Sequence, residues 1–369
     1  MENISKVRTL SYYLLMFLFS LLFLAIASEM MVRWLVPKET FWPISNIYQA
    51  VDTPAVGYTL KPHFDGIAFG VDLKTNHLGF RGDEWQLEKP VGTFRIALIG
   101  DSHAFGFGVP FQDSVGEKLA ALLNQQGGGN YEILNFGVNG YNGEQELAVL
   151  REYALQYQPD MVIVIASSND HEKARVVDQQ GWLHWDDSTQ SQTRIHDNSI
   201  DKMKLENVSW LVQHSRLILY FKLLKKRYAF AQEAHKQPQQ SAEKSAVNNW
   251  MGPFPSGAVS QRLKEPVYKP LKAMIAETKQ RNIPIIIANF NAILDYRQLF
   301  EKLSKEDAIH TLELLALFPE VDSWQELVAQ FSLGWNNHLN AIAHQRWAVA
   351  LAQLLEKQDY LPPKEDLLK

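Results

Sequence analysis

The chain has 369 residues, of which 46% are hydrophobic and 21% charged, and its net charge is −5. This composition is typical of a globular protein with a sizeable core, and it excludes a disordered, collagen-like or polytopic membrane chain. A weakly acidic chain is a poor nucleic-acid binder, because neutralising phosphates supplies most of that affinity. The sequence contains no cysteine, which excludes disulfides, thiolate metal sites and cysteine nucleophiles.

An apolar run lies near the start of the chain. Residues 10–27 carry no charge, and a run of about this length crosses a membrane. Further apolar residues follow, so the sequence predicts a cytoplasmic tail at 1–9 and a transmembrane anchor at 10–31, through which the chain contacts the lipid bilayer. Basic residues before the run favour a cytoplasmic N-terminus. The alternative is a cleaved signal peptide, because Ala25-Ile26-Ala27 resembles a cleavage site.

Two further regions follow the anchor. Residues 32–93 are rich in Pro, Gly, Asp and aromatic residues, which predicts a small β-rich juxtamembrane collar. From residue 94 to 369, strands alternate with helices, and this alternation predicts an α/β fold with a doubly wound, mainly parallel sheet. The expected strands are 94–99, 131–134, 161–166 and 283–288, and the expected helices are 118–123, 144–158, 271–280 and 345–355.

The alternation stops between residues 172 and 266, which we interpret as a helical and loop insertion after the third strand. A polar segment with Trp182 and Trp185 precedes an apolar-basic helix predicted at 210–230 and a loop at 232–249. The insertion is a candidate lid over the site. The basic helix is explained either as a solvated face or as a surface that lies on anionic lipid.

Polar residues suited to acyl transfer follow the predicted strands. Ser102 lies at the end of the first strand, at the edge of the sheet where ligands bind in open α/β folds. Taken alone, Ser102 is equally explained as a helix N-cap, and Asp101 is expected to brace the same turn. A nucleophilic serine needs a base, a backbone amide and a side-chain amide, which His338, Gly140 and Asn169 would supply.

These residues belong to four blocks that resemble, in the same order, the SGNH (GDSL-type) hydrolase superfamily. The blocks are GDS at 100–102, NFGVNG at 135–140, SND at 168–170 and NHLN at 337–340. The resemblance covers about 94–171 and 283–355 and implies an SGNH/flavodoxin-like fold. It also implies a serine ester hydrolase or a related acyltransferase. Two stretches, NHLGFR at 76–81 and GDSHAFGFGV at 100–109, resemble a membrane-anchored bacterial subgroup.

The resemblance assigns a role to each candidate residue. It implies Ser102 as the nucleophile and His338 as the general base. The oxyanion hole would consist of the backbone amides of Ser102 and Gly140 and the side chain of Asn169.

The chain departs from the family pattern in two places. The family usually has an Asp two or three positions before the catalytic His, where this chain has Asn336 and Trp335. The imidazole would then be oriented by the main-chain carbonyl of Trp335, by Asn336 Oδ1 or by a distant acid, unless the site has decayed. A neutral partner stabilises imidazolium less than a carboxylate does, which predicts slow turnover. The glycine usual before the third-block Asn is replaced by Ser167.

The sequence therefore predicts a single-pass enzyme of the bacterial inner membrane, with its catalytic domain in the periplasm or outside the cell. The expected substrate is an O-acyl group, most simply O-acetyl, on an envelope carbohydrate, or a lipid ester. One alternative is an O-acyltransferase that modifies an extracellular polysaccharide beside a membrane-bound acyltransferase partner. Another is a non-catalytic envelope assembly or glycan-binding protein. Neither a cofactor nor a metal is expected, because the sequence has no Walker loop, dinucleotide fingerprint or HExxH pattern.

Overall fold

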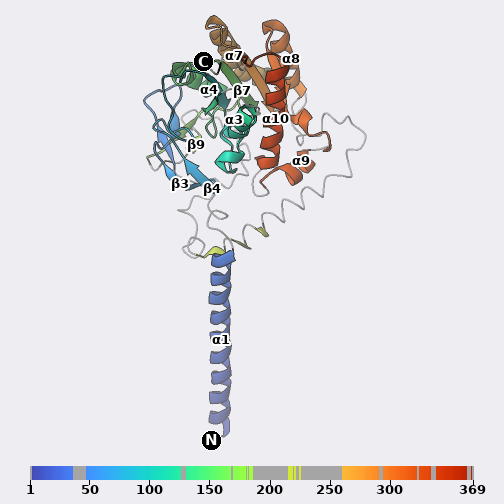
Figure 1. The fold of residues 1–369 in the computed structure, drawn as a ribbon. Helices are drawn as coiled ribbons and strands as arrows, with labels where there is room; N and C mark the ends of the chain where they lie inside the picture. The colour runs from blue at the N-terminus through green and yellow to red at the C-terminus, as the bar shows by residue number, and fades with distance from the viewer. Residues whose placement is uncertain are drawn as a thin grey trace, which may run out of the picture.

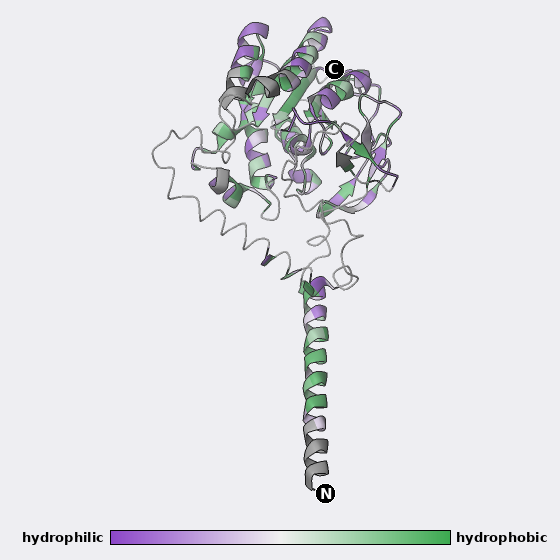
Figure 2. Cartoon of the chain, turned by 180° about the vertical axis from the view of Figure 1, so that it is seen from behind, coloured by the Kyte–Doolittle hydropathy of each residue, from purple (hydrophilic) through white to green (hydrophobic). Residues whose placement is uncertain are grey.

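A computed structural model gives the fold of most of the chain. It describes residues 2–35, 47–125, 130–167, 169–179, 181, 183–185, 215–218, 220–221, 224–225, 260–290, 294–321, 324–333, 338–363 and 367. Helix α1 (Glu2–Leu35) projects away from the remainder of the protein (Figure 1). Its segment Ser11–Leu35 is long and apolar enough to cross a membrane, and most of its apolar side chains are exposed. Figure 2 shows that hydrophobic residues make up the middle of this helix. A membrane anchor and a signal sequence both meet this criterion.

Two small antiparallel sheets follow α1 and precede the main sheet. Strand β1 (Tyr48–Ala50) pairs with β2 (Tyr58–Leu60), and β3 (Asp65–Ala68) pairs with β4 (Val71–Lys74). Gly79, in the turn that follows, has φ of +83°, and a Cβ there would lie 2.0 Å from the carbonyl oxygen of Leu60. Only glycine fits this position, so the NHLGFR stretch is locked against β2.

The central sheet has five parallel strands among the described residues. They are β5 (Thr93–Gly100), β6 (Asn130–Asn135), β7 (Met161–Ser167), β10 (Ile285–Phe290) and β11 (His310–Glu313). Their order across the sheet is β11-β10-β7-β5-β6. In chain order this is the flavodoxin-like arrangement, in which the winding reverses between the first and third strands. The predicted doubly wound α/β fold is confirmed, and residues that follow β5 and β7 meet at the reversal.

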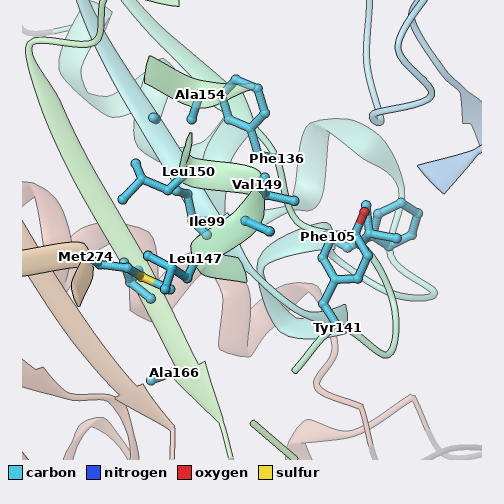
Figure 3. Packing of buried hydrophobic residues seen from close by; sticks show 14 of the residues in the cluster. Ile99, Phe105, Phe136, Tyr141, Leu147, Val149, Leu150, Ala154, Ala166 and Met274 are labelled. Carbon is cyan, nitrogen blue, oxygen red and sulfur yellow. The ribbon is translucent and has the colours of Figure 1, made fainter. Parts of the chain in front are cut away.

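Helices cover both faces of this sheet. Successive strand residues point to opposite faces, so Ile99 packs toward α4 (Gly143–Glu152) and α7 (Ser260–Gln280). Leu98 packs toward α3 (Val115–Gln125) and α10 (Ala341–Lys357) on the other face. Figure 3 shows Leu147 of α4 and Met274 of α7 beside the strands. Burial on both faces explains why residues 96–99, 161–166 and 285–288 of the three central strands are all apolar.

The predicted helices are present with shifted bounds. The helix expected at 271–280 begins at Ser260 and contains Pro266 and Pro270. Proline normally ends a helix, but burial of Val267 and Leu271 on one face holds the earlier turns in place. The helix expected at 144–158 ends at Glu152 and continues as a 3-10 turn (Ala154–Tyr157). The last helix begins at Ala341 because the Asn340 side chain caps it.

A helix beginning beside Ser102 was expected, and it is α2 (Ser102–Phe105), with Asp101 and not Ser102 as its N-cap. Elements not predicted from the sequence include β11, α8 (Leu294–Asp307), α9 (Trp324–Phe331) and an antiparallel pair, β8 (Arg175–Val177) and β9 (Leu183–Trp185), in the insertion. Most of the helix predicted at 210–230 and the whole loop at 232–249 lie outside the described residues. The lid interpretation of the insertion therefore stays a prediction.

Candidate active site

Ser102 and His338 are brought into direct contact although 236 positions separate them. The Oγ atom of Ser102 lies 2.7 Å from Nε2 of His338. Ser102 is the first residue of α2, directly after β5, and Asp101 caps this short helix by accepting a hydrogen bond from the backbone N–H of His103. His338 lies between α9 and α10, where its carbonyl accepts from Leu333 N. The predicted nucleophile and base are thus adjacent.

His338 is enclosed by rings. The Phe107 ring stacks on its imidazole at a centroid separation of 4.4 Å, and the His103 ring lies 5.4 Å away. Burial, together with the neighbouring His103, lowers the pKa of His338 from its ordinary value to about 3. The imidazole is therefore neutral at ordinary pH, as a general base must be. The two residues predicted to orient it, Trp335 and Asn336, lie outside the described residues.

Asp101 is a fully buried carboxylate beside Ser102, the predicted nucleophile. Its oxygens accept from the backbone of His103 at 2.8 Å and from Ser167 Oγ at 2.9 Å. Ser102 Oγ lies 3.3 Å from Asp101 Oδ2, which is farther than its 2.7 Å distance from His338 Nε2. Burial raises the pKa of Asp101, but the His103 ring and the hydrogen bonds from His103 and Ser167 outweigh it and hold the pKa well below its ordinary value. Asp101 braces the turn, as the sequence indicated, and also places a fixed negative charge there.

The two other predicted oxyanion residues lie on loops joined to this turn. Gly140 has φ of +78°, and its loop is tied to the end of β5 by Val138 N donating to Gly100 O. The side chain of Asn169 donates from Nδ2 to the carbonyl of Tyr141 at 3.2 Å. The Gly140 and Asn169 loops are therefore linked to each other, at the edge of the sheet that carries Ser102.

Ser167, which replaces the family's usual glycine, connects Asn169 to Asp101. Its Oγ lies 2.5 Å from Asn169 Oδ1 and 2.9 Å from Asp101 Oδ2. The hydroxyl has one proton, so Ser167 donates to one of these two oxygens at a time, while Asn169 Nδ2 donates to Tyr141 O. The sequence marks Ser167 only as a departure from the family pattern, and its bridging role became visible in the structure.

Arg81 supports the nucleophile segment from the collar, and sequence reasoning did not assign it this role. Its guanidinium is buried and donates to the carbonyl oxygens of Phe105, Gly106 and Val109, at 3.1, 2.7 and 2.7 Å. These carbonyls lie at or after the end of α2, where helical backbone partners are missing, and Gly106 O also accepts from the backbone N–H of Val109 at 3.3 Å. The NHLGFR stretch ends in Arg81, so the sequence analysis singled out this segment, but it did not indicate which groups Arg81 contacts.

Tyrosines of the collar hold the loop before Gly140. Tyr58 Oη donates to the carbonyl of Asn139 at 3.0 Å, and Asn139 Nδ2 donates to Tyr48 Oη at 3.2 Å. Tyr141 Oη in turn donates to the carbonyl of Tyr58. The β1–β2 sheet is therefore fastened to this loop. No cluster of three or more His, Cys, Asp or Glu within the described part of the chain is arranged to hold a metal ion.

A serine hydroxyl within hydrogen-bonding distance of a histidine, at the winding reversal of a parallel sheet, is the arrangement expected of a serine hydrolase with an SGNH-type fold. Residues 98–346 match the model of the GDSL-like lipase/acylhydrolase family. The chain belongs to that family, and it is an SGNH-type serine ester hydrolase or a related acyltransferase.

Solved structures of several bacterial proteins are similar to this chain. A lipolytic protein assigned to the G-D-S-L family from Desulfitobacterium hafniense is 13% identical, with 71% of this chain and 99% of that one covered and a TM-score of 0.39. The esterase EstA from Pseudoalteromonas sp. is 11% identical, with 72% and 97% covered and a TM-score of 0.39. A G-D-S-L family member from Veillonella parvula is 14% identical, with 72% and 99% covered and a TM-score of 0.36. No curated protein matches the chain.

Proposed function

We propose that this protein is a membrane-anchored serine esterase of the bacterial envelope. It removes O-acyl groups, most simply O-acetyl groups, from carbohydrate or lipid esters on the outer side of the inner membrane. The observation that carries the proposal is the 2.7 Å contact between Ser102 Oγ and His338 Nε2. This distance is within the reach that a general base needs to take the proton of a nucleophile.

The proposed reaction has two steps. Ser102 Oγ bonds to the ester carbonyl carbon while its proton passes to His338 Nε2, and the carbonyl electron pair moves onto oxygen. Backbone amides of Ser102 and Gly140 and the side chain of Asn169 stabilise that oxygen. His338 then protonates the departing alcohol and leaves an acyl-enzyme. Water, deprotonated by the same histidine, releases the acid and restores Ser102.

The covalent connection between α1 and the site supports a location at the membrane. Thirteen residues lead from the end of α1 at Leu35 to Tyr48, which bonds to the Asn139 loop next to Gly140. Fully extended, this length spans at most about 45 Å. In Figure 1, α9 lies on the side of the domain that faces α1, and Phe331 of α9 accepts from Asn340, two residues after His338. A site so tethered suits esters held at a membrane surface.

Hydrolysis of 4-nitrophenyl acetate by the full-length protein tests the proposal. We expect turnover that Ser102→Ala and His338→Ala remove, while Ser304→Ala, whose hydroxyl bonds within the distant α8 region, keeps it. A burst of one equivalent without turnover indicates transfer to an acceptor, which is the acyltransferase alternative. Equal rates in the wild type and in Ser102→Ala would reject a catalytic role for this serine.

A further inference from the structure

Arg175, the first residue of β8, lies directly against Gly140. Its Cδ, Nη1 and Cζ atoms are 3.1, 3.1 and 3.2 Å from the position that a Cβ on Gly140 would take. A side chain on Gly140 would therefore have to push the guanidinium away by a few tenths of an ångström, and the φ of +78° also favours glycine there. The guanidinium of Arg175, a residue of the insertion, therefore packs against the loop that contains Gly140.

The β8–β9 hairpin that carries Arg175 is itself held by contacts with neighbouring segments. The turn of the β8–β9 hairpin is joined to the collar, because Gly181 O accepts from Tyr48 N at 3.3 Å. Tyr48 also bonds to the Gly140 loop through Asn139. Glu172 Oε2 lies 3.7 Å from Arg175 Nη2, and about a quarter of the Arg175 side chain is exposed. The hairpin, the collar and the Gly140 loop therefore form one connected unit.

The charge of Arg175 acts on the reacting groups. Among the described residues, the charged or titratable groups that influence or adjoin His338 are Asp101, His103, Arg175 and His344. Burial lowers the pKa of His338 most, His103 and Arg175 lower it further, and Asp101 opposes them. Electrostatic effects of this kind are strong in a poorly solvated site. The anionic Asp101 beside Ser102 disfavours a second negative charge, which a cation beside Gly140 offsets.

We propose that Arg175 is a positioning residue of the oxyanion site. Its guanidinium holds the Gly140 loop in place and supplies positive charge near the carbonyl oxygen as that oxygen becomes negative. The inference rests on the proposed function, because it concerns the step in which Ser102 Oγ bonds to the carbonyl carbon. In that step the proton goes to His338 and the carbonyl electron pair goes to oxygen.

The test compares full-length Arg175→Gln and Arg175→Lys with the wild type on 4-nitrophenyl acetate, a neutral ester. We expect Arg175→Gln to lower kcat about tenfold or more with KM little changed, a smaller effect than the 100-fold or greater loss of a direct oxyanion donor. Arg175→Lys keeps the charge and should retain most of the activity. Without the cation, the acid limb of kcat/KM should move to higher pH. The exposed Lys173→Gln, which removes a nearby positive charge, should change neither quantity.

Three results would overturn the inference. One is an unchanged kcat in Arg175→Gln, and another is an effect on KM alone, which would indicate substrate binding. The third is an equal loss in Arg175→Lys and Arg175→Gln with no movement of the acid limb, which would indicate packing only. Thermal melting checks that each variant is folded.

A fluorophosphonate probe distinguishes failure of the Arg175 inference from failure of the proposed function. Ser102 Oγ displaces fluoride from phosphorus, and His338 takes the proton of the serine. A wild type that the probe does not label at Ser102 contradicts the proposed function itself. Equal labelling rates in the wild type and Arg175→Gln contradict only the role of Arg175.

Discussion

Glu146 of α4 is a buried acid whose replacement should change how stability depends on pH. The residue is fully buried, and neither carboxyl oxygen has a hydrogen-bond partner among the described residues. Burial, with the nearby Asp170 and Asp101 carboxyls, raises the pKa of Glu146 well above its ordinary value. The folded protein therefore holds a proton on Glu146 at pH values where the unfolded chain has lost it, and stability falls as pH rises above about 4.5.

The expected size follows from proton linkage. One retained proton changes the free energy of unfolding by about 1.4 kcal/mol per pH unit. Glu146→Gln removes this contribution, so its stability relative to the wild type should rise with pH above about 4.5, by at most about 1.4 kcal/mol per pH unit, until the folded carboxyl itself ionises. The glutamine amide adds a constant term through its own hydrogen-bonding needs. The informative quantity is therefore the change with pH and not the value at one pH.

The assay is urea unfolding of the full-length protein in mild detergent, followed by tryptophan fluorescence at several pH values. Glu144→Gln is the matched control, because Glu144 lies on the same helix and is exposed. This control should leave the pH dependence as in the wild type. Parallel stability curves for the wild type and Glu146→Gln would refute the argument, since they would mean that Glu146 is ionised in the folded state.

Three further predictions concern the base, the collar and α1. With a pKa of about 3 for His338, kcat/KM on a neutral ester should stay level down to about pH 4. A fall in kcat/KM centred near pH 6.5, the pKa of an unperturbed histidine, would contradict the described environment. Arg81→Lys replaces two separated guanidinium nitrogens by one ammonium nitrogen, which cannot reach all three carbonyls in their present positions, and should reduce the free energy of unfolding by about 3 kcal/mol. The exposed Arg151→Lys should cost less than about 1 kcal/mol in the same urea titration. Finally, an intact anchor predicts an unprocessed protein that stays in the membrane pellet after alkaline washing, whereas loss of mass corresponding to cleavage after Ala27 would establish a signal peptide.

Much of the fold was predictable because the strands of the sheet core are buried on both faces. The run from Met161 to Ala166 is apolar at every position, and a short run of this kind is typical of a parallel strand covered on both faces. Strand β11 (His310–Glu313) gave no such signal, because it lies at the sheet edge and its residues are only partly buried. Helix α7 was predicted to begin at residue 271, whereas it begins at Ser260, and tertiary packing holds the turns that contain Pro266 and Pro270.

The candidate site was predictable only where local chemistry marks a residue. Ser102 and His338 belong to recognisable blocks, and the structure brings them together. The Ser167 bridge and the packing of Arg175 on Gly140 depend on loops that meet only after folding. Arg175 also lies in an insertion without hydrophobic periodicity, so no pattern distinguishes it from a surface cation. What orients the imidazole of His338, and the roles assigned to Gly140 and Asn169, stay predictions.

The collar and the β8–β9 hairpin together explain how a site without the family's usual acid would remain organised. Arg81 fixes the carbonyls after the nucleophile, and Tyr58 fixes the loop before Gly140. Acyl transfer depends on the nucleophile and the oxyanion donors holding their relative positions within a fraction of an ångström. A fragment that begins at residue 94 keeps all four sequence blocks and the β8–β9 hairpin, but it loses the contacts of Arg81 and Tyr58. We therefore expect it to lack esterase activity, and full activity in such a folded fragment would show that the blocks alone suffice.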